Sequence, residues 1–470
     1  MDMKETAIKA AQFTFGLASD FFTALLDAFS KPQAFNAEFG SERLIANRLN
    51  KGFVVSSNRK ITRNMSYRNL MISSVTGGGK TTKLLVPSLL SLRNCSMIVN
   101  DNSKELYNLT SGYKSSHMVV KTLNLSDSTV SSGFNILANA KSLHDISRIA
   151  HIIVLTTLDK GNSDQFWSLS VKTLLQIFIQ LTLLQEEEFR HMANVLHLLK
   201  LFSAKPEKVD ALVAKTHDEK LVLDYSSFLA IPERTRDNIV ASAKAALQIF
   251  ESPEVAKVTS FNSIDFSEFR KTPTLLYLHV SVNDAKFLSC LLSIFFEQFY
   301  SAMLEHLPAK TDLDCFCLID EASSLYIPLL PSACANGRKF RCGSIVVVQS
   351  KGQLKTFYKD ESGNLCANCV THIHLAGQTA LEELREIEAL SGKCIYKDKD
   401  GKERTKSLVT VDEIRQLPDN RSLILCANNP IILGRVTPYW RNFSYRSYTK
   451  IPPVPLRGDI PDGPIPLIKL

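Results

Sequence analysis

The ten residues "SVTGGGKTTK" (74–83) constrain the fold of this chain more than any other stretch. An apolar run, "NLMISSV" (69–75), leads into three consecutive glycines, and a leucine-rich stretch follows them. This order predicts a buried strand, a tight loop and a helix, which is the context of the phosphate-binding pattern G-x-x-x-x-G-K-[ST]. The residues "GKT" (79–81) satisfy the second half of the pattern, whereas Ser74 stands where the first glycine is expected.

The loop has the chemistry of a nucleotide site. Glycines let backbone N–H groups point at phosphate oxygens, helped by the positive N-terminus of the following helix. We expect Lys80 to reach the β- and γ-phosphates of ATP and Thr81 to ligand Mg²⁺. Ser74 replaces glycine only if its φ is negative, because serine disfavours left-handed geometry. A glycine-rich turn with an incidental lysine is the alternative. The predicted nucleotide-binding residues are Ser74, Thr76, Gly77, Gly78, Gly79, Lys80, Thr81 and Thr82.

A second element, "CFCLIDEASSLY", places Asp320 and Glu321 at the end of an apolar run. In nucleotide-hydrolysing proteins with such a loop, an acid at this position holds Mg²⁺. A neighbouring glutamate orients and deprotonates the attacking water. Taken alone, the pair also fits a strand terminus with solvated charges. Because it follows a phosphate loop in the same chain, we assign Asp320 to the metal and Glu321 to catalysis.

A third element, "GRKFRCGSIVVVQS" (337–350), predicts a strand that ends at Gln349. A polar side chain there would lie beside the loop and sense the γ-phosphate. Either Arg338 or Arg341 would act across a subunit boundary as an arginine finger. A basic surface turn is the alternative for each arginine.

Continuous apolar runs predict a mostly parallel sheet covered on both faces, and helical stretches at 80–93 and 285–304 make the fold α/β. The predicted strands are 69–75, 95–101, 117–125, 272–281, 315–320, 343–350, 369–377 and 421–427. The stretch 146–264 breaks this rhythm and predicts an inserted all-helical domain. The predicted divisions are an N-terminal helical segment (1–37), a nucleotide-binding domain in two parts (38–145 and 265–449), the insert (146–264) and a proline-rich extended tail (450–470).

Four further features leave alternatives open. The apolar stretch 10–29 contains two aspartates, which argues against a membrane span and favours an amphipathic helix that packs on protein or on a membrane surface. From Arg43 to Arg68 there are seven basic residues and no acid, which suits DNA phosphates, anionic lipid or a solvated face. Cys366, Cys369, His372 and His374 could in principle bind zinc, but no second CxxC exists, so core packing is favoured. The run 396–406 predicts a solvated hairpin around Asp400-Gly401.

These motifs occur in an order that resembles type IV secretion coupling proteins of the TraG/TraD kind. The resemblance covers about residues 38–445. Besides the three elements above, it includes "FGSERLIANRLNKGFVVS", "IVNDNSKELYNLTSGYK", "NSDQFWSLSVKTLL", "IVASAKAALQIFESPEVAKVTSFNSIDFSEFRKTPTLLYLHV" and "SLVTVDEIRQLPDNRSLILCANNPII". The family typically has glycine in place of Ser74 and an N-terminal pair of membrane helices, which this sequence does not show.

The resemblance implies a RecA-like nucleotide-binding domain with an inserted all-α domain. It implies a hexameric, DNA-stimulated ATPase that uses ATP and Mg²⁺ to deliver a relaxase–DNA complex to a type IV secretion channel. Its expected place is the bacterial cytoplasm, peripheral at the inner membrane and docked on a separate membrane protein. Two alternatives remain: the same machine dedicated to protein effectors, with the tail docking adaptors, or a receptor that binds nucleotide without hydrolysing it.

Overall fold

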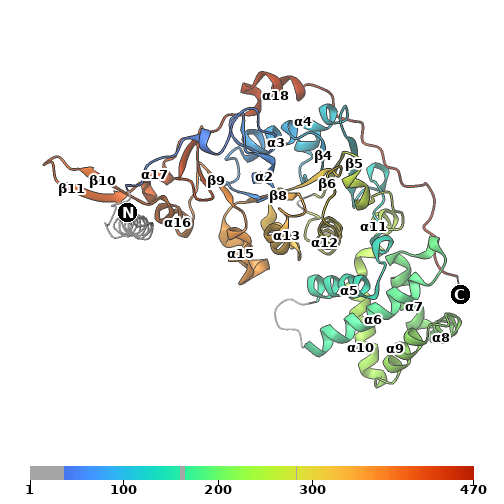
Figure 1. Cartoon of the computed structure of the whole chain (residues 1–470). Helices are drawn as coiled ribbons and strands as arrows, with labels where there is room; N and C mark the ends of the chain where they lie inside the picture. Colours follow the sequence, from blue (N-terminus) through green and yellow to red (C-terminus); the bar gives the residue numbers. More distant parts are fainter. Residues whose placement is uncertain (1–35, 159–164, 282, 470) are drawn as a thin grey trace, which may run out of the picture.

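The apolar runs of the sequence pair into one nine-stranded sheet in the order β13-β12-β9-β3-β8-β7-β4-β6-β5 (Figure 1). The structure is a computed structural model, and it describes residues 36–158, 165–281 and 283–469. Every pair from β9 to β5 is parallel, whereas β12 pairs antiparallel with both β9 and β13. The strands are β3 (Leu70–Ser73), β4 (Cys95–Asn100), β5 (Val119–Asn124), β6 (Thr274–His279), β7 (Asp314–Ile319), β8 (Cys342–Val348), β9 (Thr371–Leu375), β12 (Arg421–Cys426) and β13 (Ile432–Arg435).

Both faces of the sheet are buried. Along β3, Leu70 and Ile72 belong to one hydrophobic core and Met71 to the other, because successive side chains of a strand point to opposite faces. The first core lies under α3 (Val86–Ser91), α4 (Glu105–Lys114) and α18 (Phe443–Tyr448). The second lies under α12 (Ser289–Glu305) and α13 (Leu330–Asn336). The predicted α/β class with a mostly parallel, doubly covered sheet is confirmed.

All eight predicted strands occur in this sheet, within a few residues at either end. The ninth strand, β13, was missed by the sequence reasoning. It is four residues long, follows Pro430 and forms the outermost strand of the sheet, so its pattern is short and weak. The predicted hairpin around Asp400-Gly401 is confirmed by β10 (Lys393–Lys397) and β11 (Glu403–Ser407).

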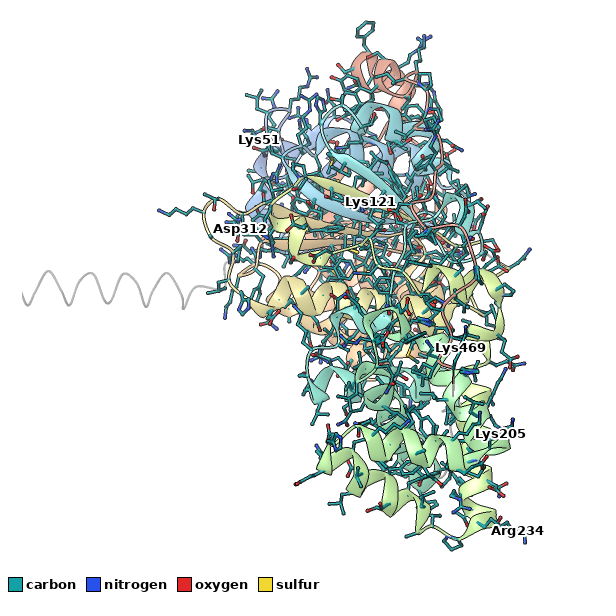
Figure 2. The ribbon with its side chains drawn as sticks, turned by 90° about the vertical axis from the view of Figure 1, so that its right-hand side faces the viewer. Lys51, Lys121, Lys205, Arg234, Asp312 and Lys469 are labelled. Carbon is teal, nitrogen blue, oxygen red and sulfur yellow. The ribbon has the colours of Figure 1, made fainter. Side chains whose placement is uncertain are left out.

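Between β5 and β6 the elements are almost entirely helical. The described residues there form α5 (Leu143–Thr157), α6 (Gln165–Leu183), α7 (Met192–Ala204), α8 (Pro206–Lys215), α9 (Glu219–Leu229), α10 (Glu233–Ala246) and α11 (Pro253–Val258). We call 143–258 the helical segment; Figure 2 shows it extending away from the sheet, with Lys205 and Arg234 towards its far end. Among the described helices, only α6 is long and apolar enough to cross a membrane. Its side chains pack instead into the core of the segment against α5, α7, α9 and α10.

The predicted helix after the loop begins as a π-helical turn (Thr81–Leu85) and continues as α3. Val86 donates its N–H to the carbonyl of Thr81, five residues back. Pro87 has no N–H to donate, and its ring would clash with the carbonyl of Lys83 in a regular helix. The wider π turn accommodates this proline.

The remaining elements flank the sheet. Residues 1–35 are outside the described residues, and with them the predicted amphipathic stretch 10–29. The tail after α18 contains no helix or strand in its described part. The other elements are β1 (Val54–Ser56), β2 (Arg59–Lys60), α2 (Arg63–Ser66), α14 (Lys355–Tyr358), α15 (Glu361–Ala367), α16 (Leu381–Ser391) and α17 (Val411–Arg415).

Candidate nucleotide-binding site

The loop predicted to bind phosphate connects β3 to the π turn, at the carboxyl edge of the sheet. Gly77 and Gly79 have φ of +81° and +84°, a region that favours glycine. The Gly78 N–H donates to the carbonyl of Val75 at 3.0 Å, which closes the turn. The loop therefore has the backbone conformation that its glycines predict.

Ser74 fits the loop without the missing glycine. It is buried and does not have a positive φ. Its N–H donates to the carbonyl of Val348 on β8 at 3.0 Å, and its hydroxyl donates to the carbonyl of Val75 at 3.2 Å. A Cβ on Gly78 would come within 2.5 Å of this hydroxyl. Ser74 thus has the backbone conformation that a serine requires here. Its hydroxyl packs against Gly78, a position that has no room for a side chain.

Lys80 and Asp320 form an ion pair in the loop. The Lys80 Nζ and Asp320 Oδ1 atoms lie 2.6 Å apart, and about one fifth of each side chain is exposed. Burial raises the pKa of the Asp320 carboxyl above its ordinary value, and the charge and hydrogen bond of Lys80 oppose that rise. The pair joins two motifs that are 240 residues apart in sequence.

Glu321 and Gln349 meet beside this pair. The Gln349 Nε2 donates to Glu321 Oε1 at 2.7 Å. Glu321 has φ of +63°, which is unusual for a residue other than glycine and occurs at functional turns. Parallel pairing of β3, β8 and β7 explains the meeting, because their carboxyl ends share one edge of the sheet.

The three threonines occupy different positions in the loop. Thr76 is exposed at its tip, before Gly77. Thr81 is the first residue of the π turn, directly after Lys80. Thr82 donates its hydroxyl to the carbonyl of Gly79 at 3.3 Å.

The two arginines do not reach this site within one chain. Arg338 and Arg341 precede β8, whereas Gln349 follows it, and seven strand residues span about 23 Å. Arg338 donates from Nε to the Asn64 side chain at 3.3 Å and lies at the surface. Arg341 is held by Asp314, with Nε 3.4 Å from Oδ1. Of the two arginines, Arg341 is therefore held in an ion pair, whereas Arg338 forms no ion pair with the described residues.

Sequence reasoning missed several residues around the loop. Lys83 donates from Nζ to the carbonyls of Gly78 and Asp419, at 2.8 Å each, and so ties the loop to the turn before β12. Asn100, at the end of β4, donates to the carbonyl of Asp320 at 3.0 Å. Its position at a strand end on the same edge was the available signal.

A buried polar pair supports the neighbouring strand. His374 on β9 is the register partner of Ser73, and its Nδ1 lies 3.3 Å from Glu383 Oε1 on α16. Burial raises the pKa of the Glu383 carboxyl, but the contacts with His374 and Ser73 outweigh burial and leave it below its ordinary value.

The CxxC residues do not gather around a metal. His372 donates from Nε2 to the carbonyl of Cys366 at 3.1 Å, and burial lowers its pKa to about 3. Cys369, two residues before β9, is buried. The part of the chain that the structure describes contains no group of three metal-binding side chains.

Some side chains of the basic segment, Arg43 to Arg68, form ion pairs within the fold. Arg59 pairs with Glu42 at 3.1 Å, and Arg63 pairs with Asp314. Its exposed members are Arg43, Arg48 and Lys51, the last of which is labelled in Figure 2.

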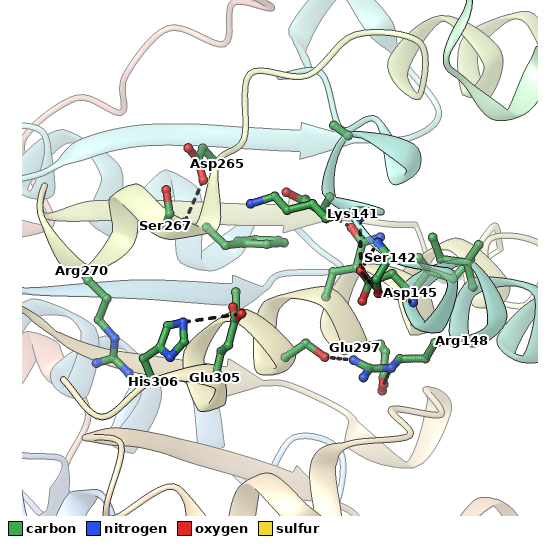
Figure 3. Close-up of a pocket in the computed structure, with 18 of the residues that line it drawn as sticks. Lys141, Ser142, Asp145, Arg148, Asp265, Ser267, Arg270, Glu297, Glu305 and His306 are labelled. Atoms are coloured by element: carbon green, nitrogen blue, oxygen red, sulfur yellow. Dashed lines mark hydrogen bonds and ion pairs between the residues drawn. The ribbon is translucent and has the colours of Figure 1, made fainter. Parts of the chain in front are cut away.

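A cavity of about 940 Å³ lies away from the loop, between α5, α12 and the 3₁₀ turn Phe266–Arg270 (Figure 3). The Arg148 Nε lies 3.7 Å from Glu297 Oε1 on its wall. Both acidic and basic side chains line it, so its lining does not select one ligand charge.

The sheet order, the glycine loop and the acid pair define a RecA-like P-loop protein. The model of the family described as Type IV secretory system Conjugative DNA transfer matches residues 42–453. The chain belongs to this family, as the order of its motifs implied. Family membership places the chain among proteins of conjugative DNA transfer by type IV secretory systems.

Solved structures share the fold. The bacterial conjugative coupling protein TrwBdeltaN70, in complex with sulphate, has a TM-score of 0.67 at 19% identity, over 86% of this chain and 94% of that chain. TrwB in complex with ADP and Mg²⁺ has a TM-score of 0.65 at 20% identity, over 86% and 94%. VirB4 of Thermoanaerobacter pseudethanolicus has a TM-score of 0.50 at 12% identity, over 83% and 97%. Among curated protein sequences, no match is found.

Proposed function

We propose that the chain is an ATPase that delivers conjugative DNA to a type IV secretion channel. The observation that carries this proposal is the convergence of Lys80, Asp320, Glu321 and Gln349 at one loop, through contacts of 2.6 and 2.7 Å. Family membership supplies the context of DNA transfer. The TrwB structures in complex with nucleotides show that this fold accommodates a nucleotide.

The loop would bind the phosphates of ATP. Its backbone N–H groups, in the conformation set by Gly77 and Gly79, would donate to phosphate oxygens, and Lys80 would contact the β- and γ-phosphates. Thr76 and Thr82 flank these donors. Lys83 would keep the loop in this shape by holding the carbonyl of Gly78.

Mg²⁺ fits the donors present. Asp320 already accepts a cation, the Lys80 ammonium, and hydroxyl and carboxylate oxygens are the ligands that Mg²⁺ prefers. The Thr81 hydroxyl and the Asp320 carboxylate would hold the ion. Bound there, it would neutralise charge on the β- and γ-phosphates.

Glu321 would orient the attacking water and accept its proton. The hydrogen bond from Gln349 Nε2 holds one oxygen of Glu321 in place, and the Gln349 Oε1 atom would remain an acceptor for a further hydrogen bond. We infer that Gln349 senses the γ-phosphate and transmits its loss to Glu321. This role is positioning, because it acts through another side chain.

We propose that Arg338 completes the site of a neighbouring subunit. It lies at the edge opposite the loop and is bonded only weakly, to Asn64 at 3.3 Å. An arginine supplied in trans stabilises the charge of the phosphoryl-transfer transition state. The active form would then be a ring, with six subunits as the resemblance implies, and the helical segment would form an inserted domain of each.

The test is ATP hydrolysis with and without single-stranded DNA, beside Lys80→Ala. The proposal expects hydrolysis that DNA stimulates and that the variant abolishes. Stimulation by a cargo protein but not by DNA would favour the protein-effector machine. Nucleotide binding without hydrolysis under any condition would favour the alternative of a receptor that binds nucleotide but does not hydrolyse it.

A further inference from the structure

The proline-rich tail is tied to the molecule from end to end. In Figure 1 it runs from α18 past α11 and ends beside α7. Three groups of contacts hold it, on α4, on the turns after β5, and on the start of α7. The described tail, 450–469, therefore crosses from the sheet to the helical segment.

The first two groups hold the tail near the sheet. On α4, the Tyr107 hydroxyl donates to the carbonyl of Val454 at 2.6 Å. At the turn after β5, Asp459 Oδ1 accepts from the Gly133 N–H at 3.1 Å and from the Ser263 hydroxyl at 2.7 Å. A Cβ on Gly112 would collide with the carbonyl of Pro452 at 2.0 Å, so α4 is shaped for this close approach.

The third group is a set of hydrogen bonds between side chains at the start of α7 and the tail backbone. Buried Asn194 contacts the tail backbone twice: its amide nitrogen donates to the carbonyl of Pro466 at 3.1 Å, and its oxygen accepts from the Ile468 N–H at 3.0 Å. His191, also buried, donates from Nε2 to the same Pro466 carbonyl at 2.9 Å. His197 donates to the carbonyl of Ile468 at 3.0 Å.

These hydrogen bonds are made to the tail backbone, and one buried side chain adds to them. Within the site, only the Ile468 side chain enters the hydrophobic core, where it is 6% exposed, whereas Leu467 beside it is 40% exposed. Extended peptides are commonly bound in this way, with main-chain hydrogen bonds for affinity and a pocket for alternate side chains.

The link between the second and third groups is loose. Asp462 is fully exposed, and its ion pair with Lys257 has a separation of 3.9 Å. Gly463 has φ of +126° and no neighbour within 4 Å of an added Cβ. Few contacts of Asp462 and Gly463 therefore tie the third group to the first two.

We propose that the start of α7 is a peptide-binding groove for an extended Pro-x-Ile segment, occupied at rest by the chain's own residues 464–469, and that it also accepts the same segment of a second copy. This proposal is independent of ATP hydrolysis. We assign a second copy as the partner because its tail has the same sequence as the segment bound at the start of α7. A tethered segment has an effective concentration of about millimolar, so the chain's own tail competes strongly with any free one.

The test uses the full chain with Ile468→Asp, which removes the apolar anchor and vacates the groove. The probe is a fluorescent peptide of residues 462–470 of the natural sequence, followed by anisotropy. We expect it to bind the variant at least about tenfold more tightly than the wild-type chain, in which the tether competes. Leu467→Asp is the matched control: the same change on the exposed neighbour should leave the groove filled.

A second variant tests the hydrogen bond from His197 to the tail backbone. His197→Ala, at a half-buried position, added to Ile468→Asp should weaken peptide binding about three- to tenfold, as expected for one lost hydrogen bond. A folded Ile468→Asp chain that does not bind the peptide would overturn the proposal and make the tail a fixed part of the fold. Equal binding by the Leu467→Asp control would overturn it as well, since capture would not depend on the groove.

Discussion

The ion pair between Lys80 and Asp320 permits a quantitative prediction about stability. Exposed ion pairs contribute about 0.2–1 kcal/mol, and removing one partner of a fully buried pair costs about 3–5 kcal/mol. This pair lies between the two cases, because each side chain is about one fifth exposed at a separation of 2.6 Å. We expect a coupling free energy of about 1–3 kcal/mol from the cycle of Lys80→Met, Asp320→Asn and the double variant.

The direction in which stability changes with pH follows from the pKa of Asp320. Its pKa in the folded chain is raised above the ordinary value, so its contribution to stability falls as pH rises through the folded pKa. Lys80→Met removes the groups that oppose this rise and moves the pKa further up. The destabilisation by Lys80→Met should therefore be smaller at pH 5 than at pH 8, whereas Asp320→Asn should abolish this difference.

Urea unfolding followed by circular dichroism measures the cycle. The matched control is Lys351→Met with Glu386→Gln, a pair of similar length, 2.7 Å, whose glutamate is nearly half exposed. It should give a coupling below about 1 kcal/mol. A coupling for Lys80 and Asp320 no larger than that of the control would refute the reasoning.

Three further predictions concern the loop, the base and the basic segment. Ser74→Gly should change the Kd for ATP less than about threefold, measured by nucleotide titration, because Ser74 already has a backbone conformation open to any residue; a larger gain would mean that the serine weakens the site. Glu321→Gln should keep ATP binding and lower kcat at least about 100-fold, since the general base is lost; near-normal turnover would remove Glu321 from that role. Arg48→Ala with Lys51→Ala should lower the salt slope of single-stranded DNA binding by about 1.4, for two lost phosphate contacts, and an unchanged slope would assign the segment to lipid or solvent.

The central sheet could be predicted from the sequence because its strands are buried on both faces. Runs such as "CFCLID" and "GSIVVVQS" are apolar throughout, which is typical of a covered parallel sheet. Strand β13 was not predicted because it is short and lies at the edge of the sheet. The π turn escaped because it depends on how Pro87 meets the carbonyl of Lys83, which a periodic pattern does not encode.

The part of the candidate site that lies in short sequence motifs could be predicted. Asp320 and Gln349 were each predicted at a strand end and Lys80 at the end of the glycine loop, and the parallel order of β3, β8 and β7 explains why they meet. Lys83 was missed because its partner, the carbonyl of Asp419, belongs to a turn 336 residues away. Such side-chain contacts with a distant backbone leave no spacing pattern in the sequence.

The tail shows the same limit. Its prolines predicted an extended chain, and the described tail has no helix or strand. Its path depends on Asn194 and His191, which stand in an otherwise apolar helical stretch and give no sign of a partner near residue 466. That the tail docks adaptor proteins stays a prediction. An adaptor that bound the end of the tail would compete with the proposed groove at the start of α7.

Mixing two inactive variants is the most direct test of a site shared between subunits. Lys80→Ala keeps Arg338 but lacks the phosphate contact, and Arg338→Ala keeps the loop but lacks the arginine supplied to a neighbour. We predict that each variant alone fails to hydrolyse ATP. The mixture should regain a part of the wild-type rate, because some interfaces then combine an intact loop with an intact arginine. A mixture no more active than the sum of its parts, or full activity of Arg338→Ala alone, would contradict it.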